Sequence, residues 1–333
     1  MNISTTHKHS ASKQDTDLEI LIRLTPYLEK NSFLDIGAER GVFAEIFASC
    51  GLKGILFEPL PKHKENLEAL VKKIDCEFFS YAVDSKDGPA TFHIACDENN
   101  NALDHFHSLQ LLVDDTRVKH NQSIAVDCRS LNSLYQEGKI DKKIGIIKID
   151  TEGNDLKVLQ GMDDIEAEII VCEFFMPGIY SGWEQAHPDG LIAELNKLGF
   201  NHCILIKRIE QHEFVSVDNF EFVEKQWGNL IFINDKIFHQ ARTILDKIVN
   251  EKELQLIHSI NHHTNILEQE IVTLRQACEQ RLHLIDQLNL ACQEKEIAYS
   301  ALKSCHSSRT KQLYPRKILK KMRTLFQKQK INS

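Results

Sequence analysis

Two carboxylates directly follow the most apolar segment of the chain. Residues 144–153 read IGIIKIDTEG, so Asp150 and Glu152 stand two residues apart at the end of a predicted strand. Carboxylates in such a place suit a general base or an acceptor for a substrate hydroxyl. They would also suit helix capping, with Asp150 or Thr151 as the cap and Glu152 favoured by the helix dipole. Asp155 would serve the same capping purpose, and we favour catalytic roles for Asp150 and Glu152.

A glycine-containing loop follows the first predicted strand. Residues 35–41 read DIGAERG and lead directly into a predicted helix. Gly37 would let the backbone turn sharply and a ligand approach closely, and Gly41 would allow tight packing at the helix start. The G-x-x-x-G spacing departs from the G-x-G-x-x-G of dinucleotide-binding proteins. The loop therefore counts against NAD.

An acid follows the second predicted strand. Glu58 comes after the apolar segment ILF and lies 21 residues beyond Gly37. A carboxylate at this place can accept hydrogen bonds from both ribose hydroxyls of an adenosine group. A solvated surface acid is the alternative. The loop and the acid together indicate an adenosine cofactor, without choosing between S-adenosylmethionine and NAD.

Short apolar runs alternate with helical stretches through most of the chain. We expect strands at residues 33–36, 53–57, 78–83, 91–95, 144–149, 168–172, 203–206 and 230–233, and helices at residues 17–29, 42–50, 61–74, 130–136, 156–159 and 190–198. The strands are almost continuously apolar, which favours a parallel sheet covered on both faces. An antiparallel α+β domain would instead alternate polar and apolar residues along each strand. Residues 97–122 lack clear periodicity and are predicted to form a long variable loop.

Six stretches of the chain occur in the order and spacing of one known family. They lie within about residues 32–235 and read FLDIGAERGVFAEIF, ILFEPLP, YAVDSKDGPATFHI, SLNSLYQE, IIKIDTEGNDLKVLQGM and IIVCEF. With them the sequence resembles the FkbM family of S-adenosylmethionine-dependent methyltransferases. The resemblance implies an α/β, Rossmann-like class I methyltransferase fold with a mostly parallel seven-stranded sheet. It also implies methyl transfer from S-adenosylmethionine to a hydroxyl of a sugar, a glycan chain or a natural product.

The resemblance also assigns roles to individual residues. The residues expected to bind the cofactor are Asp35, Gly37, Ala38, Gly41, Glu58 and Ala82. The loop would hold the methionine end, Glu58 the ribose, and residues 81–83 would flank the adenine. Asp150 is the expected proton acceptor or hydroxyl aligner, and Glu173, at the end of a later strand, is a second candidate. Glu39 stands where the family more often has asparagine, which leaves open a direct contact from this position.

Sixteen histidines raise the question of a metal site. His105 and His107 alternate as strand ligands would, but a catalytic metal site needs three protein ligands together. The sequence shows no such cluster near Asp150, so we expect no metal. Residues 97–122 are instead predicted to form a lid or substrate loop, in which a histidine is an alternative base. Trp183 would either stack on a sugar face or lie partly buried at the surface.

The composition is that of a globular chain. The 333 residues are 42% hydrophobic and 26% charged, which excludes a wholly disordered or collagen-like protein. Nine cysteines, an odd count without a CxxC pair, favour a reducing compartment. The sequence has no run of 18 apolar residues and no signal-peptide pattern. We therefore expect a cytoplasmic protein without a transmembrane helix.

Charge is distributed unevenly along the chain. The net charge of -8 combines +10 over residues 297–333 with -18 over residues 1–296. In the basic segment 313–333, one helical face is formed by Ile318, Leu319, Met322, Leu325 and Phe326. This pattern is typical of an interfacial helix on an anionic membrane, with a solvated tail as the alternative. We expect weak peripheral association with the inner membrane face, and no nucleic-acid binding because the acidic body would oppose it.

A heptad pattern marks the C-terminal part of the chain. The a positions are Ile257, Thr264, Ile271, Cys278, Ile285, Cys292 and Tyr299, and the d positions are Ile260, Leu267, Leu274, Arg281, Leu288, Lys295 and Leu302. The pattern predicts a coiled coil and a homo-oligomer, with a long helix packed on its own domain as the alternative. The predicted domains are a disordered leader at 1–15, a methyltransferase-like domain at 16–236, a coiled coil at 237–312 and a basic tail at 313–333.

Two classes of function follow from these patterns. We favour an O-methyltransferase that acts on a sugar or glycan hydroxyl, because the cofactor loop, Glu58, Asp150 and Glu152 occur together. The alternative is a non-catalytic scaffold, in which a degenerate methyltransferase domain supports coiled-coil assembly. An NAD-dependent enzyme is disfavoured by the glycine spacing.

Overall fold

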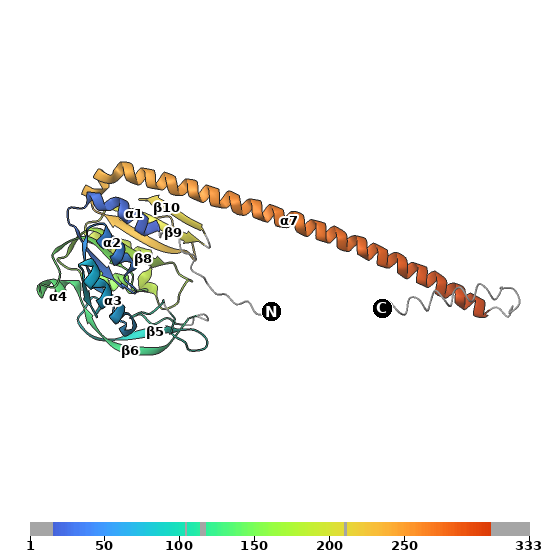
Figure 1. The fold of residues 1–333 in the computed structure, drawn as a ribbon, viewed down its shortest axis with the longest axis horizontal. Helices are drawn as coiled ribbons and strands as arrows, with labels where there is room; N and C mark the ends of the chain where they lie inside the picture. Colours follow the sequence, from blue (N-terminus) through green and yellow to red (C-terminus); the bar gives the residue numbers. More distant parts are fainter. Residues whose placement is uncertain (1–15, 104, 114–117, 210–211, 308–333) are drawn as a thin grey trace. The chain divides into compact units, whose positions relative to one another are not determined.

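The computed structural model describes residues 16–103, 105–113, 118–209 and 212–307, in two compact units that divide between Ser259 and Ile260. The predicted leader and the predicted basic tail lie outside the described residues. The first unit contains both sheets and the shorter helices (Figure 1).

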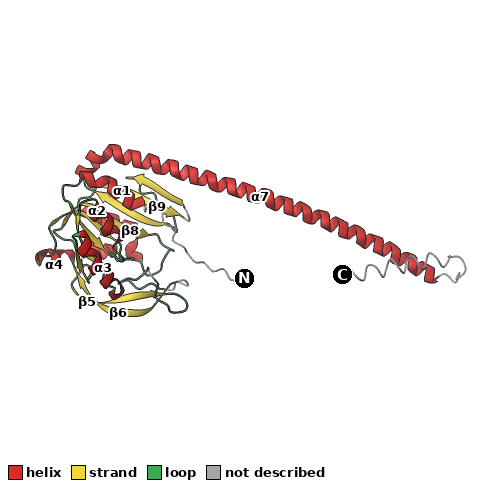
Figure 2. Ribbon diagram, viewed as in Figure 1, coloured by secondary structure: helices red, strands yellow, loops and turns green. Residues whose placement is uncertain are grey.

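An eight-stranded sheet forms the centre of the first unit (Figure 2). Its strands in spatial order are β10 (His212–Val217), β9 (His202–Ile209), β11 (Trp227–Ile233), β8 (Glu166–Phe175), β7 (Lys143–Ile149), β1 (Ser32–Ile36), β2 (Lys53–Phe57) and β3 (Glu77–Phe79). The strands from β8 to β3 pair in parallel, whereas β11, β9 and β10 pair antiparallel to their neighbours. The carboxyl ends of the parallel strands therefore meet at one edge of the sheet.

The sheet differs from the predicted one in two ways. It has eight strands instead of the predicted seven, and it is mixed: β8 to β3 pair in parallel as expected, whereas β11, β9 and β10 pair antiparallel. The sequence HEFVSV of β10 did not predict a strand because only three of its six residues are apolar. β10 lies at the edge of the sheet and is mostly half-buried, so it needs fewer apolar residues than a central strand. The predicted strand 78–83 is divided between β3 and β4 (Ala82–Val83), which belong to different sheets.

A smaller, three-stranded sheet pairs β4 and β5 (Gly88–Cys96) with β6 (Lys119–Arg129). β6 begins inside the segment 97–122 that was expected to be a loop. Polar residues dominate its first half, because that half is mostly exposed and pairs as a ribbon with β5. This sheet carries the residues beside the candidate site.

Helices cover both faces of the large sheet. They are α1 (Thr16–Leu24), the 3-10 helix η1 (Thr25–Tyr27), α2 (Val42–Ser49), α3 (Pro61–Ile74), α4 (Leu131–Gln136), α5 (Asp155–Gln160), the 3-10 helix η2 (Glu184–Ala186), α6 (Pro188–Lys197) and α7 (Asp235–Ser307). One core cluster unites α1, α2, α3 and the start of α7 with Ile146 of β7; the other unites α4, α5 and α6 with Ile147. Successive strand residues thus face opposite cores, which explains why the central strands are continuously apolar.

The long helix α7 has 73 residues. Its first turns belong to the first unit, where Ile237, Ala241 and Leu245 are buried in the core, and Lys252 donates to Glu19 of α1 over 2.6 Å. From Ile260 to Tyr299 its large apolar residues are exposed. The helix expected from the heptads is therefore present, while the coiled coil, which needs a second helix, stays a prediction. Within the described residues no helix is both long and apolar enough to cross a membrane.

Candidate functional site

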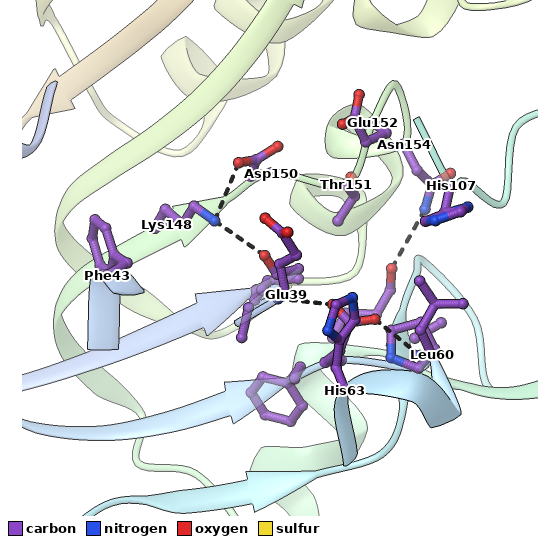
Figure 3. Close-up of a pocket in the computed structure, with 18 of the residues that line it drawn as sticks. Glu39, Phe43, Leu60, His63, His107, Lys148, Asp150, Thr151, Glu152 and Asn154 are labelled. Atoms are coloured by element: carbon purple, nitrogen blue, oxygen red, sulfur yellow. Dashed lines mark hydrogen bonds and ion pairs between the residues drawn. The ribbon is translucent and has the colours of Figure 1, made fainter. Parts of the chain in front are cut away.

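A cavity of about 260 Å³ lies where the parallel strands end. The loops after β1, β2 and β7 line it, together with Tyr81–Val83 and residues 105–107 and 109 (Figure 3). Of the residues predicted to bind a cofactor, Gly37, Ala38, Glu58 and Ala82 line the cavity, as do the predicted catalytic Asp150 and Glu152. Asp35, Gly41 and Glu173 do not.

The loop after β1 is held tightly against its neighbours. The backbone N–H groups of Gly37 and Ala38 both donate to the Phe57 carbonyl, at 2.9 and 3.1 Å. Gly37 has φ +79, and a Cβ there would lie 1.9 Å from the Asp150 carbonyl oxygen. Glycine at this position therefore lets the loops after β1 and β7 touch. Gly41, also at positive φ, faces Leu70 of α3, so its role is in packing α2 against α3.

Lys148 connects the buried and the accessible acids of the site. Its Nζ lies 3.3 Å from Asp35 Oδ1 and 3.2 Å from Asp150 Oδ2, and it donates to the Gly37 carbonyl over 3.1 Å. Figure 3 shows Lys148 directed toward Asp150. Burial alone would lower the pKa of Lys148, but Asp150 and Asp35 outweigh it and raise that pKa. Asp35 is fully buried, so it acts by anchoring the lysine rather than by reaching the cavity.

Glu58 is buried at the side of the cavity. Its Oε2 accepts from the Glu39 N–H and its Oε1 from the Leu60 N–H, each at 2.9 Å. Each carboxylate oxygen has two lone pairs, so both retain capacity for a further donor. Burial raises the pKa of Glu58 to about 7, and the two backbone donors only partly oppose this. Hydroxyl donors from a ligand would favour the ionised form.

Asp150 and Glu152 have different surroundings. The Asp150 side chain is 43% exposed and is oriented by Lys148. Glu152 has φ +54, and its Oε1 accepts from the Phe106 N–H at 3.1 Å. Burial, reinforced by Asp150, raises the pKa of Glu152 to about 8. Asp150 is thus the accessible carboxylate, whereas Glu152 is engaged in holding the 106–110 segment.

Asp155 organises the loop from behind. One oxygen, Oδ1, accepts from both the backbone N–H and the hydroxyl of Thr151, and Oδ2 accepts from the Glu173 N–H at 2.8 Å. The loop is thus tied by Asp155 rather than by Asp150, and neither of them caps α5, whose N-cap residue Asn154 makes no side-chain cap bond. Glu173 lies behind this loop. Burial, reinforced by Asp150 and Glu152, raises the pKa of the Glu173 carboxyl well above its ordinary value.

Residues 106–110, inside the segment predicted to form a lid or substrate loop, form a strap over the loop after β7, and the sequence did not predict these contacts. Besides Phe106, Ser108 donates its hydroxyl to the Thr151 carbonyl at 3.3 Å, and Gln110 Nε2 donates to Asn154 Oδ1 at 2.7 Å. The fully buried Asn154 also donates to Asp84 at 3.1 Å. The sequence offered one signal for this contact, the amide of Asn154 within the acidic motif. Its partners Gln110 and Asp84 are distant in sequence, so the pattern could not identify them.

The two histidines and the tryptophan singled out earlier have distinct positions. His107 Nδ1 accepts from the Ala95 N–H at 3.0 Å, and Nε2 lies 2.9 Å from the Leu103 carbonyl. Burial and the charge of Lys62 lower the pKa of His107 to about 4, so it is a poor base. His105 is exposed at the cavity, with Nδ1 3.9 Å from Glu39 Oε2. Trp183 is buried under Gly153, so it supports the loop and does not present a face to a sugar.

Among the described residues, no group of three or more histidine, cysteine, aspartate or glutamate side chains is arranged to hold a metal ion.

Together these features define a class of protein. A glycine turn after the first strand, an acid after the second and a cavity at the strand ends are the arrangement of Rossmann-like nucleotide-binding folds. The family model of the methyltransferase FkbM domain matches residues 35–201, half of the 333 residues. The chain belongs to the FkbM methyltransferase family, and its methyl donor is S-adenosylmethionine.

The solved structures that match the chain are distant in sequence. A precorrin-6y C5,15-methyltransferase from Geobacter metallireducens is 7% identical, with 68% of this chain and 92% of that chain covered and a TM-score of 0.36. An rRNA methylase from Streptococcus thermophilus is 7% identical, with 68% and 99% covered and a TM-score of 0.34. An O-methyltransferase family protein from Burkholderia thailandensis is 8% identical, with 66% and 55% covered and a TM-score of 0.34. No curated protein matches the chain.

The residues of the cavity fit an adenosine-containing methyl donor. Glu58 offers unfilled lone pairs on a buried carboxylate to ribose hydroxyls. Tyr81–Val83 provide an apolar and aromatic wall for the adenine ring. The Gly37 loop, which is expected to hold the methionine end, contacts Asp150. S-adenosylmethionine supplies an activated methyl group when bound, so the residues of the chain need only align the acceptor and take up a proton.

Proposed function

We propose that the protein transfers the methyl group to a hydroxyl oxygen of a sugar or glycan. The observation that carries this proposal is the Asp150 carboxylate, which lines the cavity, is accessible and is fixed in place by Lys148. A hydroxyl needs to lose a proton as it becomes an ether, and an ionised carboxylate within hydrogen-bonding reach can accept it.

Lys148 and Asp150 have different roles in the proposed reaction. Lys148 holds the Asp150 carboxylate beside the Gly37 loop, because it binds both Asp150 and the Gly37 carbonyl. The acceptor oxygen forms a bond to the methyl carbon, the methyl–sulfur bond breaks to leave S-adenosylhomocysteine, and the proton passes to Asp150. Alignment accounts for much of the rate enhancement in such a reaction.

Polar groups around the cavity support a polyhydroxylated acceptor. Glu39 and His105 also line the cavity, 3.9 Å apart, and their carboxylate and imidazole groups can bind several hydroxyls. An anionic acceptor would be repelled by Glu39 and Asp150. The favoured substrate is therefore a neutral sugar or glycan.

The test begins with calorimetry of the full chain. S-adenosylhomocysteine should bind, NAD should not, and Glu58→Ala should lose the binding while remaining folded. Methyl transfer from radiolabelled S-adenosylmethionine is then measured for neutral sugars and glycans, with amine and thiol acceptors as controls. Transfer to amines or thiols alone would overturn the choice of hydroxyl. Absence of cofactor binding by the folded chain would favour the non-catalytic scaffold.

A further inference from the structure

The second unit of the chain carries an apolar stripe along one helix. We define the seam of α7 as the a positions Thr264, Ile271, Cys278, Ile285, Cys292 and Tyr299 with the d positions Ile260, Leu267, Leu274, Arg281, Leu288 and Lys295. Its apolar members are exposed; Leu274 and Leu288 have exposed fractions of 65% and 58%. A stripe of about 60 Å of exposed apolar residues on a helix is typical of an interaction surface.

We infer that the seam pairs with the seam of a second copy of this chain, in parallel and in register, as a two-stranded coiled coil. The distribution of residue shapes supports two strands. Isoleucine occupies a at 271 and 285, and leucine occupies d at 267, 274 and 288. β-Branched residues at a with leucine at d favour parallel dimers over trimers and tetramers.

Charges beside the seam support the parallel orientation. Glu270 is at position g and Arg275 is at position e of the next heptad, and both are exposed. In a parallel dimer, g of one helix faces the following e of the other, so Glu270 meets Arg275 of the second copy twice by symmetry. An antiparallel pair would bring g opposite g and e opposite e, and this match would be lost.

Polar residues within the seam fix its register. Arg281 and Lys295 at d weaken the packing, and in register each faces the same cation of the second copy, so that their long side chains extend to solvent. A shift by one heptad would place Arg281 against Leu274 or Leu288 and bury the cation beside apolar residues. Cys278 and Cys292 at a would each face the same cysteine of the second copy, which provides a chemical probe of register.

The first measurement is the mass of the reduced full chain. Light scattering and sedimentation equilibrium should give twice the 38.3 kDa monomer mass. Leu274→Glu places a charge in the seam and should raise the dimer dissociation constant by about 100-fold or more. Gln276→Glu, on the opposite side at f, is the matched control and should leave it unchanged. A monomeric, trimeric or tetrameric full chain would overturn the inference.

A charge exchange tests the pairing across the seam. Glu270→Lys and Arg275→Glu should each weaken the dimer about fivefold, and the double exchange should restore it. All of these positions lie outside the first unit, so S-adenosylhomocysteine binding reports whether that unit stays folded. Lack of restoration by the double exchange would contradict the parallel pairing.

Disulfide trapping distinguishes the orientations. The background is the full chain with Cys50→Ser and Cys305→Ser, oxidised by diamide, which takes up the two hydrogens as each disulfide forms. With Cys292→Ser added, Cys278 alone should link two chains, and with Cys278→Ser added, Cys292 alone should do so. Linkage that requires both cysteines would indicate an antiparallel pair, and this would overturn the inference independently of whether the protein is a methyltransferase.

Discussion

At the scale of single residues, two neighbouring acids have acquired different tasks. Asp150 and Glu152 are two residues apart, yet Asp150 is accessible beside Lys148 while Glu152 accepts from the Phe106 N–H. The positive φ of Glu152 turns its side chain toward the strap instead of toward Lys148. A general base must be within reach of the substrate, so the accessible Asp150 is the better candidate.

Replacing Asp150 tests this assignment. Asp150→Asn keeps the size of the side chain but removes the proton acceptor, so we expect kcat to fall by about 10²–10⁴-fold. S-adenosylhomocysteine affinity, measured by calorimetry, should change little. Asp141→Asn, an exposed residue, is the matched control. Retention of kcat by the Asp150 variant would assign the proton to another group.

Glu58 predicts a pH dependence of cofactor binding. Its pKa in the free protein is raised to about 7, and ribose hydroxyls would favour its ionised form. Affinity for S-adenosylhomocysteine should therefore decrease as pH falls through 7, by about tenfold from pH 8 to pH 6. The Glu58→Gln variant should bind more weakly at pH 8 and lack this slope. An equally steep slope in the variant would assign the titration to a different group.

At the scale of elements, the loops after β1 and β7 are positioned by their mutual contact. Gly37→Ala would place a Cβ 1.9 Å from the Asp150 carbonyl, at φ +79. We expect a loss of about 2–4 kcal/mol in the free energy of unfolding and loss of S-adenosylhomocysteine binding. Gly51→Ala is the control, because it has φ +86 but no atom within 4 Å of the added Cβ. Its cost should be about 1 kcal/mol, with binding retained; equal effects of the two variants would show that φ, not the contact, matters.

The strap predicts an effect of pH on stability. The pKa of Glu152 is raised to about 8, above its ordinary value near 4.5. The folded protein then holds a proton that the unfolded chain releases, so this group reduces stability as pH rises from about 4.5 to 8. Glu152→Gln still accepts from the Phe106 N–H but cannot ionise.

Thermal and denaturant unfolding measure this difference. Glu152→Gln should be more stable than the unmodified chain by about 1–2 kcal/mol at pH 8.5 and nearly equal to it at pH 5. Glu98→Gln, in an exposed turn, should show no such difference between the two pH values. A Glu152→Gln variant that is less stable at pH 8.5 would mean that the charge itself stabilises the strap.

At the scale of the whole molecule, the two units lead us to propose that cofactor binding belongs to the first unit and self-association to the second. The first unit ends at Ser259 and includes the first turns of α7, whose Ile237, Ala241 and Leu245 complete the core. A chain that ends at residue 259 should therefore fold, bind S-adenosylhomocysteine within about twofold of the full chain's affinity, and sediment as a monomer. A chain that ends at residue 236 should lose several kcal/mol because it exposes that core. If both truncated chains are equally stable, the start of α7 contributes nothing to the first unit.

The sequence by itself determined the local structure and the class of the protein. Helix 61–74 and the strand 53–57 have the predicted bounds, because proline at the helix start and continuous apolar residues are local signals. The order of motifs from Asp35 to Glu152 likewise indicated the methyltransferase family, since the loop, the acid and the carboxylate motif stand at the ends of β1, β2 and β7. These features depend on neighbours within a few residues.

Only the tertiary structure decided which of these residues reach the cavity. Asp35 and Gly41 belong to the loop motif but do not line the cavity. Lys148 reaches Asp35 and the Gly37 loop because β1 and β7 are neighbours in the sheet. The strap of residues 106–110 and the buried Trp183 depend on partners far away in the chain. Periodicity and spacing contain no information on such contacts, because packing and burial are set when distant segments meet.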